Sequence, residues 1–278
     1  MKAVKRPEGG GSLPVFLLSL ALLLAGSSCS NRSAIPFNPV LATQASNGLI
    51  LIQESDSHAI WAAQTDRQTA RDILAALQAN SEQICADLQT KCRFPVLVEV
   101  YPDQASFDKH VMNPEMRGFF AISGFPHTIQ MVSPANPAPH QVSYEEGVSV
   151  AVHEFVHLAL DEVNDELPIW LDEGTAVYLA PHRRYTRVCE QAFPFELVPS
   201  FRQLEEDYED IQAADLFAYT AVDFIVSRYG METLNSLLHT PQDLEQILGL
   251  SQEEFEESWL RFMRTHYHNH SAKASFDS

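Results

Sequence analysis

Two histidines four residues apart are the first sign of chemistry in this sequence. They are His153 and His157, in the stretch AVHEFVHLAL, with Glu154 between them. Residues i and i+4 lie on one side of an α-helix, so both imidazoles can bind the same cation. In this HExxH arrangement the histidines bind Zn²⁺ and the glutamate acts as general base toward a water that the metal activates. The alternative is a chance motif, two surface histidines on a helix without metal.

A third ligand is expected from the segment PIWLDEGTA. A catalytic zinc uses three protein ligands and keeps one position open. Glu173 follows His157 by 16 residues, and Pro168 fits the first turn of a second helix. Residues 161–167 are long enough to turn the chain back, which would bring Glu173 opposite the histidines. Asp172 either orients one histidine or faces solvent.

The helix that carries both histidines has its own start signal. Ser143 and Glu146 have the spacing of a capping box, in which each side chain satisfies a free backbone N–H. One apolar stripe follows at helical spacing, formed by Val148, Val152, Phe155 and Ala159.

The remaining elements predict an α+β fold, with strands and a helix first and helices after residue 143. Strands are expected at 49–53, 95–101 and 127–133, and a helix at 66–90. Residues 118–124 are expected to form a loop. The acidic stretch 205–210 is either a cation site or, as we expect, a solvated helix face.

HEFVH followed by PIWLDEGTA resembles the gluzincin metallopeptidases, and specifically the peptidase MA-like domain proteins. In that family HExxH precedes a Trp-Leu-x-Glu-Gly-x-Ala segment. Residues 215–230 and 244–263 also resemble the family's aromatic helix and its closing helical pair. The resemblance implies a thermolysin-like zincin fold with a small N-terminal sheet and helix, an HExxH helix and a helical C-terminal lobe.

The resemblance also implies roles for individual residues. His153, His157 and Glu173 correspond to the ligands of one Zn²⁺ per chain, and Glu154 corresponds to the general base. A Tyr or His usually donates a hydrogen bond to the oxyanion, and the candidate is Tyr219, with Tyr185 and His182 as competitors.

Other parts of the pattern concern the substrate and the ligand environment. The strand at 127–133 resembles the edge strand on which such enzymes bind an extended peptide. The aminopeptidase motif Gly-x-Met-Glu-Asn is absent, which argues against that kind of exopeptidase. Val177 replaces the aspartate that supports the ligands in thermolysin.

The N-terminus has the features of an export signal. A basic start and an apolar run at 13–24, too short to span a bilayer, lead to Cys29. The segment Ala25-Gly-Ser-Ser-Cys29 resembles the lipobox of bacterial lipoproteins, and an ordinary secretory signal is the alternative. We expect a signal peptide at 1–28, a tether at 29–47, a metallopeptidase domain at 48–265 and a polar tail at 266–278.

Charge limits the partners. The chain has a formal net charge of −19, with 18 basic and 37 acidic side chains. Nucleic acid is therefore an unsuitable partner, because phosphate contacts need a positive surface. Repulsion from anionic lipids implies that membrane attachment depends on acyl chains on Cys29.

Cysteines and histidines outside the motif give two further hypotheses. In an oxidising compartment Cys85 and Cys92 can form a disulfide that joins a helix end to a strand start, and Cys189 is then a buried thiol. His266, His268 and His270 lie in a polar tail, where we expect no designed metal site.

Together these observations predict an exported, lipid-anchored zinc metallopeptidase of the bacterial cell envelope, acting as an endopeptidase on a peptide or protein substrate. The alternative is a non-catalytic zinc-containing envelope lipoprotein that serves as a binding or scaffold module. The retained Glu154 favours the enzyme, because a structural zinc site needs no base and closes its fourth position with a protein ligand.

Overall fold

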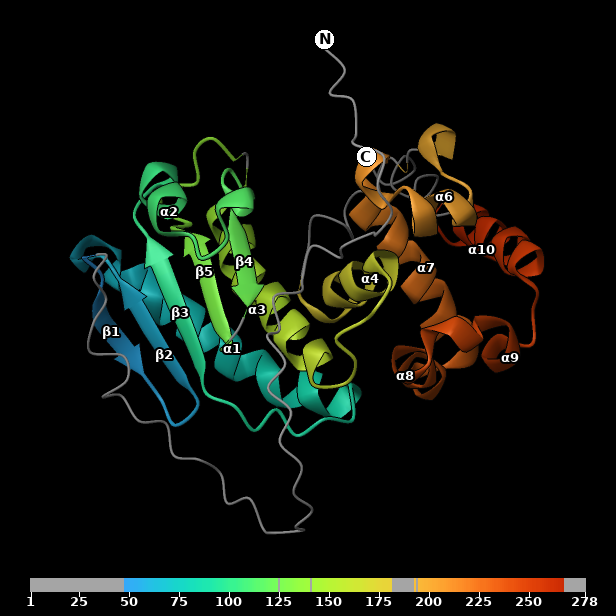
Figure 1. Cartoon of the computed structure of the whole chain (residues 1–278), viewed down its shortest axis with the longest axis horizontal. Coiled ribbons are helices and arrows are strands. Elements are labelled where there is room, and N and C mark those ends of the chain that lie inside the picture. Colours follow the sequence, from blue (N-terminus) through green and yellow to red (C-terminus); the bar gives the residue numbers. More distant parts are fainter. Residues whose placement is uncertain (1–47, 125, 141, 182–192, 194, 268–278) are drawn as a thin grey trace, which may run out of the picture. The chain divides into compact units, whose positions relative to one another are not determined.

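The computed structural model describes residues 48–267, except 125, 141, 182–192 and 194. Its fold is of the mixed α+β class, with strands and helices first and helices after (Figure 1). The strands and helices have these bounds: β1 Ile50–Glu54, β2 His58–Ala62, α1 Arg67–Asp87, β3 Val96–Tyr101, α2 Gln104–His110, β4 Ala121–Gly124, β5 Thr128–Val132, α3 Tyr144–Asp161, α4 Ile169–Leu179, α6 Phe201–Glu206, α7 Ala214–Tyr229, α8 Met231–His239, α9 Leu244–Leu248 and α10 Gln252–His266.

The strands form one mixed sheet in the order β1-β2-β3-β5-β4. β2, β3 and β5 are parallel, whereas β1 and β4 are antiparallel to their neighbours. The ladder between β1 and β2 is interrupted by a register shift between Leu51 and Gln53.

The strand at 127–133 is confirmed as β5, but its expected place at the sheet edge is wrong. β5 lies between β3 and β4, and β4 is the edge strand next to it. The expected loop at 118–124 is wrong for its second half, because residues 121–124 form β4. Ser123 and Gly124 have weak strand propensity, so pairing with β5 is what makes this segment a strand.

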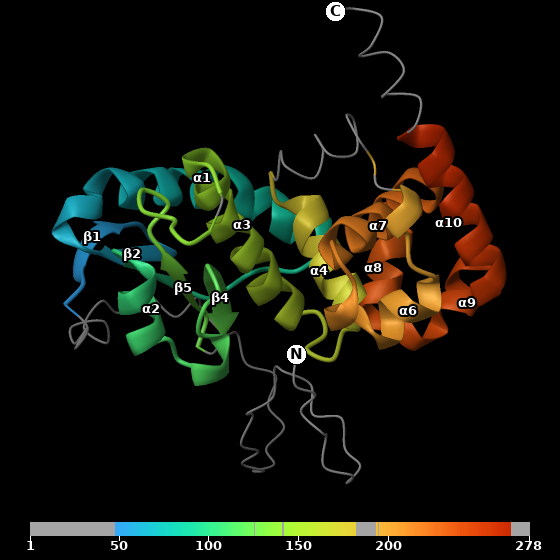
Figure 2. The same ribbon diagram turned by 90° about the horizontal axis from the view of Figure 1, so that it is seen from above.

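Helices cover both faces of the sheet. Figure 2 shows α1 and α3 on one face and α2 on the other. A core of small and branched side chains fills the first face and continues into the helical part. The opposite face has a smaller core in which Tyr101, Phe107 and Val132 are buried under α2. This layering leaves α3 beside the edge of the sheet that β4 forms.

The helices after α3 pack around α7. Gly174 of α4 permits a close approach, since a Cβ atom there would lie only 2.6 Å from the backbone oxygen of Ala218 on α7. On the far side of α7 the buried Trp259 of α10 donates a hydrogen bond from Nε1 to Thr220 Oγ1 at 3.0 Å. α4 therefore packs against α7, which is itself held in place by α10.

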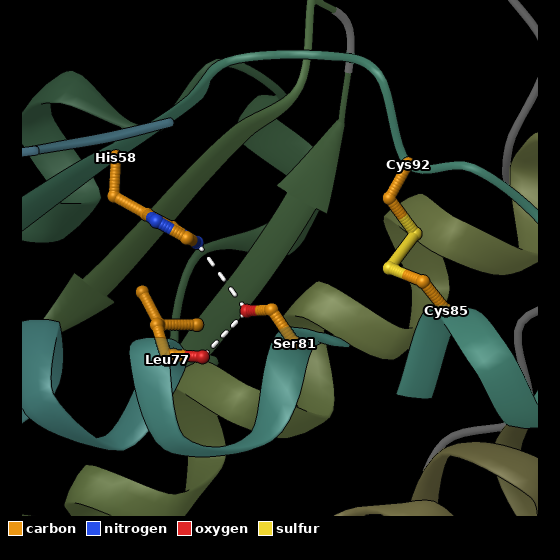
Figure 3. The surroundings of a disulfide bond; sticks show 5 residues. All are labelled: His58, Leu77, Ser81, Cys85 and Cys92. Carbon is orange, nitrogen blue, oxygen red and sulfur yellow. Dashed lines mark hydrogen bonds between the residues drawn. A yellow bond between two sulfur atoms is a disulfide. The ribbon is translucent and has the colours of Figure 1, made fainter. Parts of the chain in front are cut away.

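The structure contains the disulfide between Cys85 and Cys92, which the sequence left open as one possibility. The bond joins the end of α1 to the segment that leads into β3 (Figure 3). Nearby, His58 is buried at the start of β2. Its Nδ1 lies 2.9 Å from Ser57 Oγ and its Nε2 lies 3.4 Å from Ser81 Oγ. Ser81 donates its own proton to the Leu77 carbonyl at 2.5 Å, so Nε2 carries the histidine proton.

Several expectations concern residues outside the described part of the chain. They are the signal peptide at 1–28, the tether at 29–47, Cys29, Cys189, His268 and His270. Of the expected tail at 266–278 the structure describes residues 266 and 267: His266 ends α10, and Tyr267 is buried with its hydroxyl bonded to Asp223. No helix among the described residues has the length and apolar character needed to cross a membrane.

Candidate metal centre

The packing of α3 is as the sequence predicts, but of the predicted capping box only the Ser143 half is present, because Glu146 Oε1 is buried without a hydrogen-bond partner among the described residues. Ser143 caps the helix by accepting a hydrogen bond from the Glu146 backbone N–H at 3.3 Å. Val152, Phe155 and Ala159 are buried against the core. The apolar stripe fixes the rotation of the helix, and this rotation turns His153 and His157 toward α4.

α4 carries the third candidate ligand. It begins directly after Pro168, and its first turn is anchored by the buried Trp170 and Leu171. The contact of Gly174 with α7 holds the next turn in place. Glu173 lies between these anchors, and the sequence expectation that it faces the two histidines is confirmed.

Three side-chain atoms converge at this point. Nε2 of His153 and Nε2 of His157 lie 3.0 Å apart, and Oε2 of Glu173 lies 3.3 Å from the first and 3.7 Å from the second. Ligand atoms at about 2.05 Å from a tetrahedral zinc lie about 3.3 Å from one another. The cluster can therefore hold a metal ion, and its spacing suits one of that size.

Asp172 contacts the back of this cluster. Its Oδ1 lies 3.0 Å from His157 Nδ1, the ring nitrogen that points away from Glu173. Of the two expected roles for Asp172, orientation of a histidine is the one that its position matches.

The local field favours positive charge. Burial acts to lower the pKa of His157, but the carboxylates of Asp172, Glu173 and Glu154 outweigh it and hold this pKa well above 6.5. A site that attracts a proton in this way also attracts a divalent cation. The site is accessible as well, because the Glu173 side chain is 27% exposed.

Glu154 lies beside the cluster and is buried. Burial raises the pKa of its carboxyl group, while the two imidazoles and an interaction with the Ser123 side chain of β4 act against this rise. A general base works best with a pKa near the working pH, so this environment suits proton transfer. Sequence reasoning did not find Ser123, because its strand was not predicted.

A second carboxyl group is perturbed at the end of α3. Partial burial and the neighbouring Asp172 raise the pKa of Asp161 to about 6. The acidic run that begins at this residue was the only signal in the sequence. Asp161 adds negative potential near Asp172 and His157.

Of the three candidates for the oxyanion donor, only Tyr219 lies in the described part of the chain. Tyr219 lies on α7, which packs against α4, and its ring centroid is 6.3 Å from that of Tyr178. Its role as the oxyanion donor stays a prediction. Tyr185 and His182 lie outside the described residues.

Comparison with known proteins adds no assignment. The chain matches no protein-family model, and no curated protein matches it either.

Proposed function

We propose that this protein is a zinc metallopeptidase of the gluzincin type with a thermolysin-like arrangement of its site. The observation that carries the proposal is the convergence of His153, His157 and Glu173 on one point, with the buried Glu154 beside it. A purely structural zinc site would close its fourth position with a protein ligand. Among the described residues the cluster offers only three ligands, His153, His157 and Glu173, which leaves a fourth position for water or substrate.

Zinc held by these residues would make an attacking water molecule more acidic and would polarise the substrate carbonyl. The Glu154 carboxylate accepts a proton from the attacking water and delivers it to the amide nitrogen as the C–N bond breaks. Asp172 keeps His157 in the orientation in which Nε2 faces His153 Nε2 and Glu173 Oε2. Tyr219 is the candidate donor to the oxyanion.

The substrate is an extended peptide or a flexible protein segment bound along β4. β4 is the strand at the edge of the sheet on the side of α3, and its outer backbone groups pair with no other strand of the described part. A peptide added there forms main-chain hydrogen bonds of the kind seen in strand addition. β4 thus takes the role that the sequence assigned to β5.

The cell envelope is the proposed location, with Cys29 as the lipid-modified anchor. The Cys85–Cys92 disulfide supports an oxidising compartment outside the cytoplasm.

The test combines zinc content with peptide hydrolysis in three variants. Wild type and Glu154→Gln should each bind about one zinc per chain, because Glu154 is not a ligand. Glu154→Gln should lower the rate by about 10²- to 10⁴-fold, the usual contribution of a general base. His153→Ala should lose both zinc and hydrolysis.

Glu145→Gln is the matched control, since Glu145 is exposed in the first turn of the same helix. It makes the same change of charge and should leave both zinc and activity intact. Zinc binding without cleavage of any peptide by the wild type would instead indicate the binding or scaffold lipoprotein.

A further inference from the structure

One face of the open β4 edge carries an exposed apolar side chain, Met112. This residue follows α2 and its side chain is 45% exposed. The position of its thioether is defined by Gly124, the last residue of β4, because a Cβ atom there would lie 3.6 Å from Met112 Cε. Met112 therefore extends over β4 on the face opposite α3.

The backbone of Met112 is firmly held. Its N–H donates to Oε1 of Gln130 on β5 at 2.7 Å. Gln130 is itself buried, and its Nε2 donates to Glu99 Oε2 at 2.7 Å and to Tyr101 Oη at 3.0 Å. Because Gln130 pairs with Ile122 of β4, Met112 starts above β5 and reaches across toward the open edge.

The alternation of side chains along β4 relates this face to the candidate site. Ser123 points to the α3 face, where it interacts with Glu154. Ile122 and Gly124 point to the other face, where Ile122 joins the core under α2 and Gly124 meets Met112. A peptide paired with β4 must alternate in the same way, one side chain toward the metal ligands and the next toward Met112.

We propose that Met112 is a specificity-determining residue that recognises an apolar side chain of the bound peptide. The inference rests on the proposed peptidase function and names the class of substrate for that site. Glu154 is level with Ser123, so the scissile bond lies at this level of the strand. The residue opposite Gly124 is next to it, and its side chain faces Met112.

Met112 and Gly124 suit the recognition of an apolar peptide side chain. Gly124 has no side chain, so the space beside Met112 at the β4 edge is available to the side chain of the peptide residue opposite Gly124. Methionine is flexible and polarisable, and it adapts to apolar partners of several shapes. A charged side chain in this place would lose hydration without gaining a partner.

The experiment measures hydrolysis of peptide sets in which one position at a time is Leu, Phe, Ser or Asp. With wild type, one position next to the scissile bond should prefer Leu and Phe. Met112→Ser should reduce kcat/KM for these peptides about tenfold, the value expected for partial burial of one apolar side chain, and leave the Ser peptide unchanged. Met112→Leu should restore the preference.

Ile50→Ser is the control, because Ile50 is 43% exposed on β1 at the opposite edge of the sheet. It removes an equally exposed apolar side chain and should not change the preference. An apolar preference that persists unchanged in Met112→Ser would overturn the inference while the peptidase proposal stands.

A binding measurement separates the two proposals. The zinc-loaded Glu154→Gln protein is titrated with the same fluorescent peptides, with and without Met112→Ser. An apolar preference in binding that depends on Met112 supports the inference even when wild type cleaves nothing. Binding that ignores Met112, or absence of both binding and cleavage, contradicts it.

Discussion

The hydrogen bond between Asp172 and His157 defines the direction in which one ligand faces. Asp172→Asn keeps the size of the side chain and removes its charge, so the hydrogen bond to His157 Nδ1 becomes a weaker neutral one and His157 becomes less basic. We expect zinc affinity to fall about 10- to 100-fold, as is usual when such a partner is changed. Competition with a zinc-binding indicator dye measures the effect.

Asp165→Asn is the control for this change, since Asp165 is an exposed residue of the neighbouring loop and contributes to the same acidic region. Equal losses of affinity in the two variants would mean that general electrostatics, and not the hydrogen bond to His157, accounts for the effect.

His58 gives a prediction for stability against pH. Burial lowers its pKa below 6.5, and its two ring nitrogens contact serine hydroxyls and, within the described part of the chain, no carboxylate. Below about pH 6.5 the unfolded chain therefore binds a proton that the folded protein resists, and stability falls as the pH is lowered toward the folded pKa. The loss is at most about 1.4 kcal/mol per pH unit.

Urea unfolding of wild type and His58→Gln at pH 7.5 and 5.5, both with a chelator present, tests this prediction. The variant should be less stable at pH 7.5 but should lose less stability on acidification. The same loss in both proteins would show that His58 does not contribute to the pH dependence.

The convergence of the three candidate ligands was predictable at this scale, whereas their surroundings were only partly so. Spacing alone places His153 and His157 together, because the geometry of one helix determines it. The approach of Glu173 needs only a turn and a second helix. Ser123 and Met112 were not predictable, since their positions depend on which strand lies at the sheet edge.

At the scale of elements, the contact between α4 and α7 decides where Glu173 lies. Helix propensity alone would make Gly174→Ala stabilising by about 1 kcal/mol. The added Cβ would instead meet the Ala218 backbone at 2.6 to 2.8 Å, and backbone atoms cannot move aside independently. We expect a destabilisation of about 1–3 kcal/mol and weaker zinc binding, because the helices must separate.

Chemical unfolding together with zinc titration tests Gly174→Ala. Gly124→Ala serves as the control for stability, because its Cβ would make an ordinary contact at 3.6 Å with a flexible side chain. A stabilised Gly174→Ala protein would mean that the two helices adjust without cost.

Element prediction worked where the local pattern was strong. Residues 67–87 and 96–101 have a clear period or a continuous apolar run, and both elements were expected. β2, α2 and β4 were missed because they are short, and β4 ends in residues of weak strand propensity. The order of strands in the sheet could not be predicted, because the sequence of a strand does not determine which strands pair with it.

For the whole molecule, the Cys85–Cys92 disulfide stabilises the connection between α1 and β3. The same helix end is bound from the helical part, where Asn235 Nδ2 donates to the Asp87 carbonyl at 2.7 Å. Replacing both cysteines by serine should cost roughly 2–3 kcal/mol by the chain-entropy estimate for so short a loop. Urea unfolding measures the difference.

Reduced wild type should unfold at the same urea concentration as the double variant, and reductant should not affect the variant. Identical stability of oxidised and reduced wild type would contradict a stabilising role for the disulfide.

The interrupted ladder in β1 has a consequence for self-association. Among the described residues the sheet has two open edges, β1 and β4. Such a sheet can join end to end with copies of itself and grow into a filament. β1 exposes Ile50 and Leu51, but the register shift after Leu51 breaks the regular template that an incoming strand needs. With β4 only four residues long, amyloid-like growth is disfavoured at both ends of the sheet.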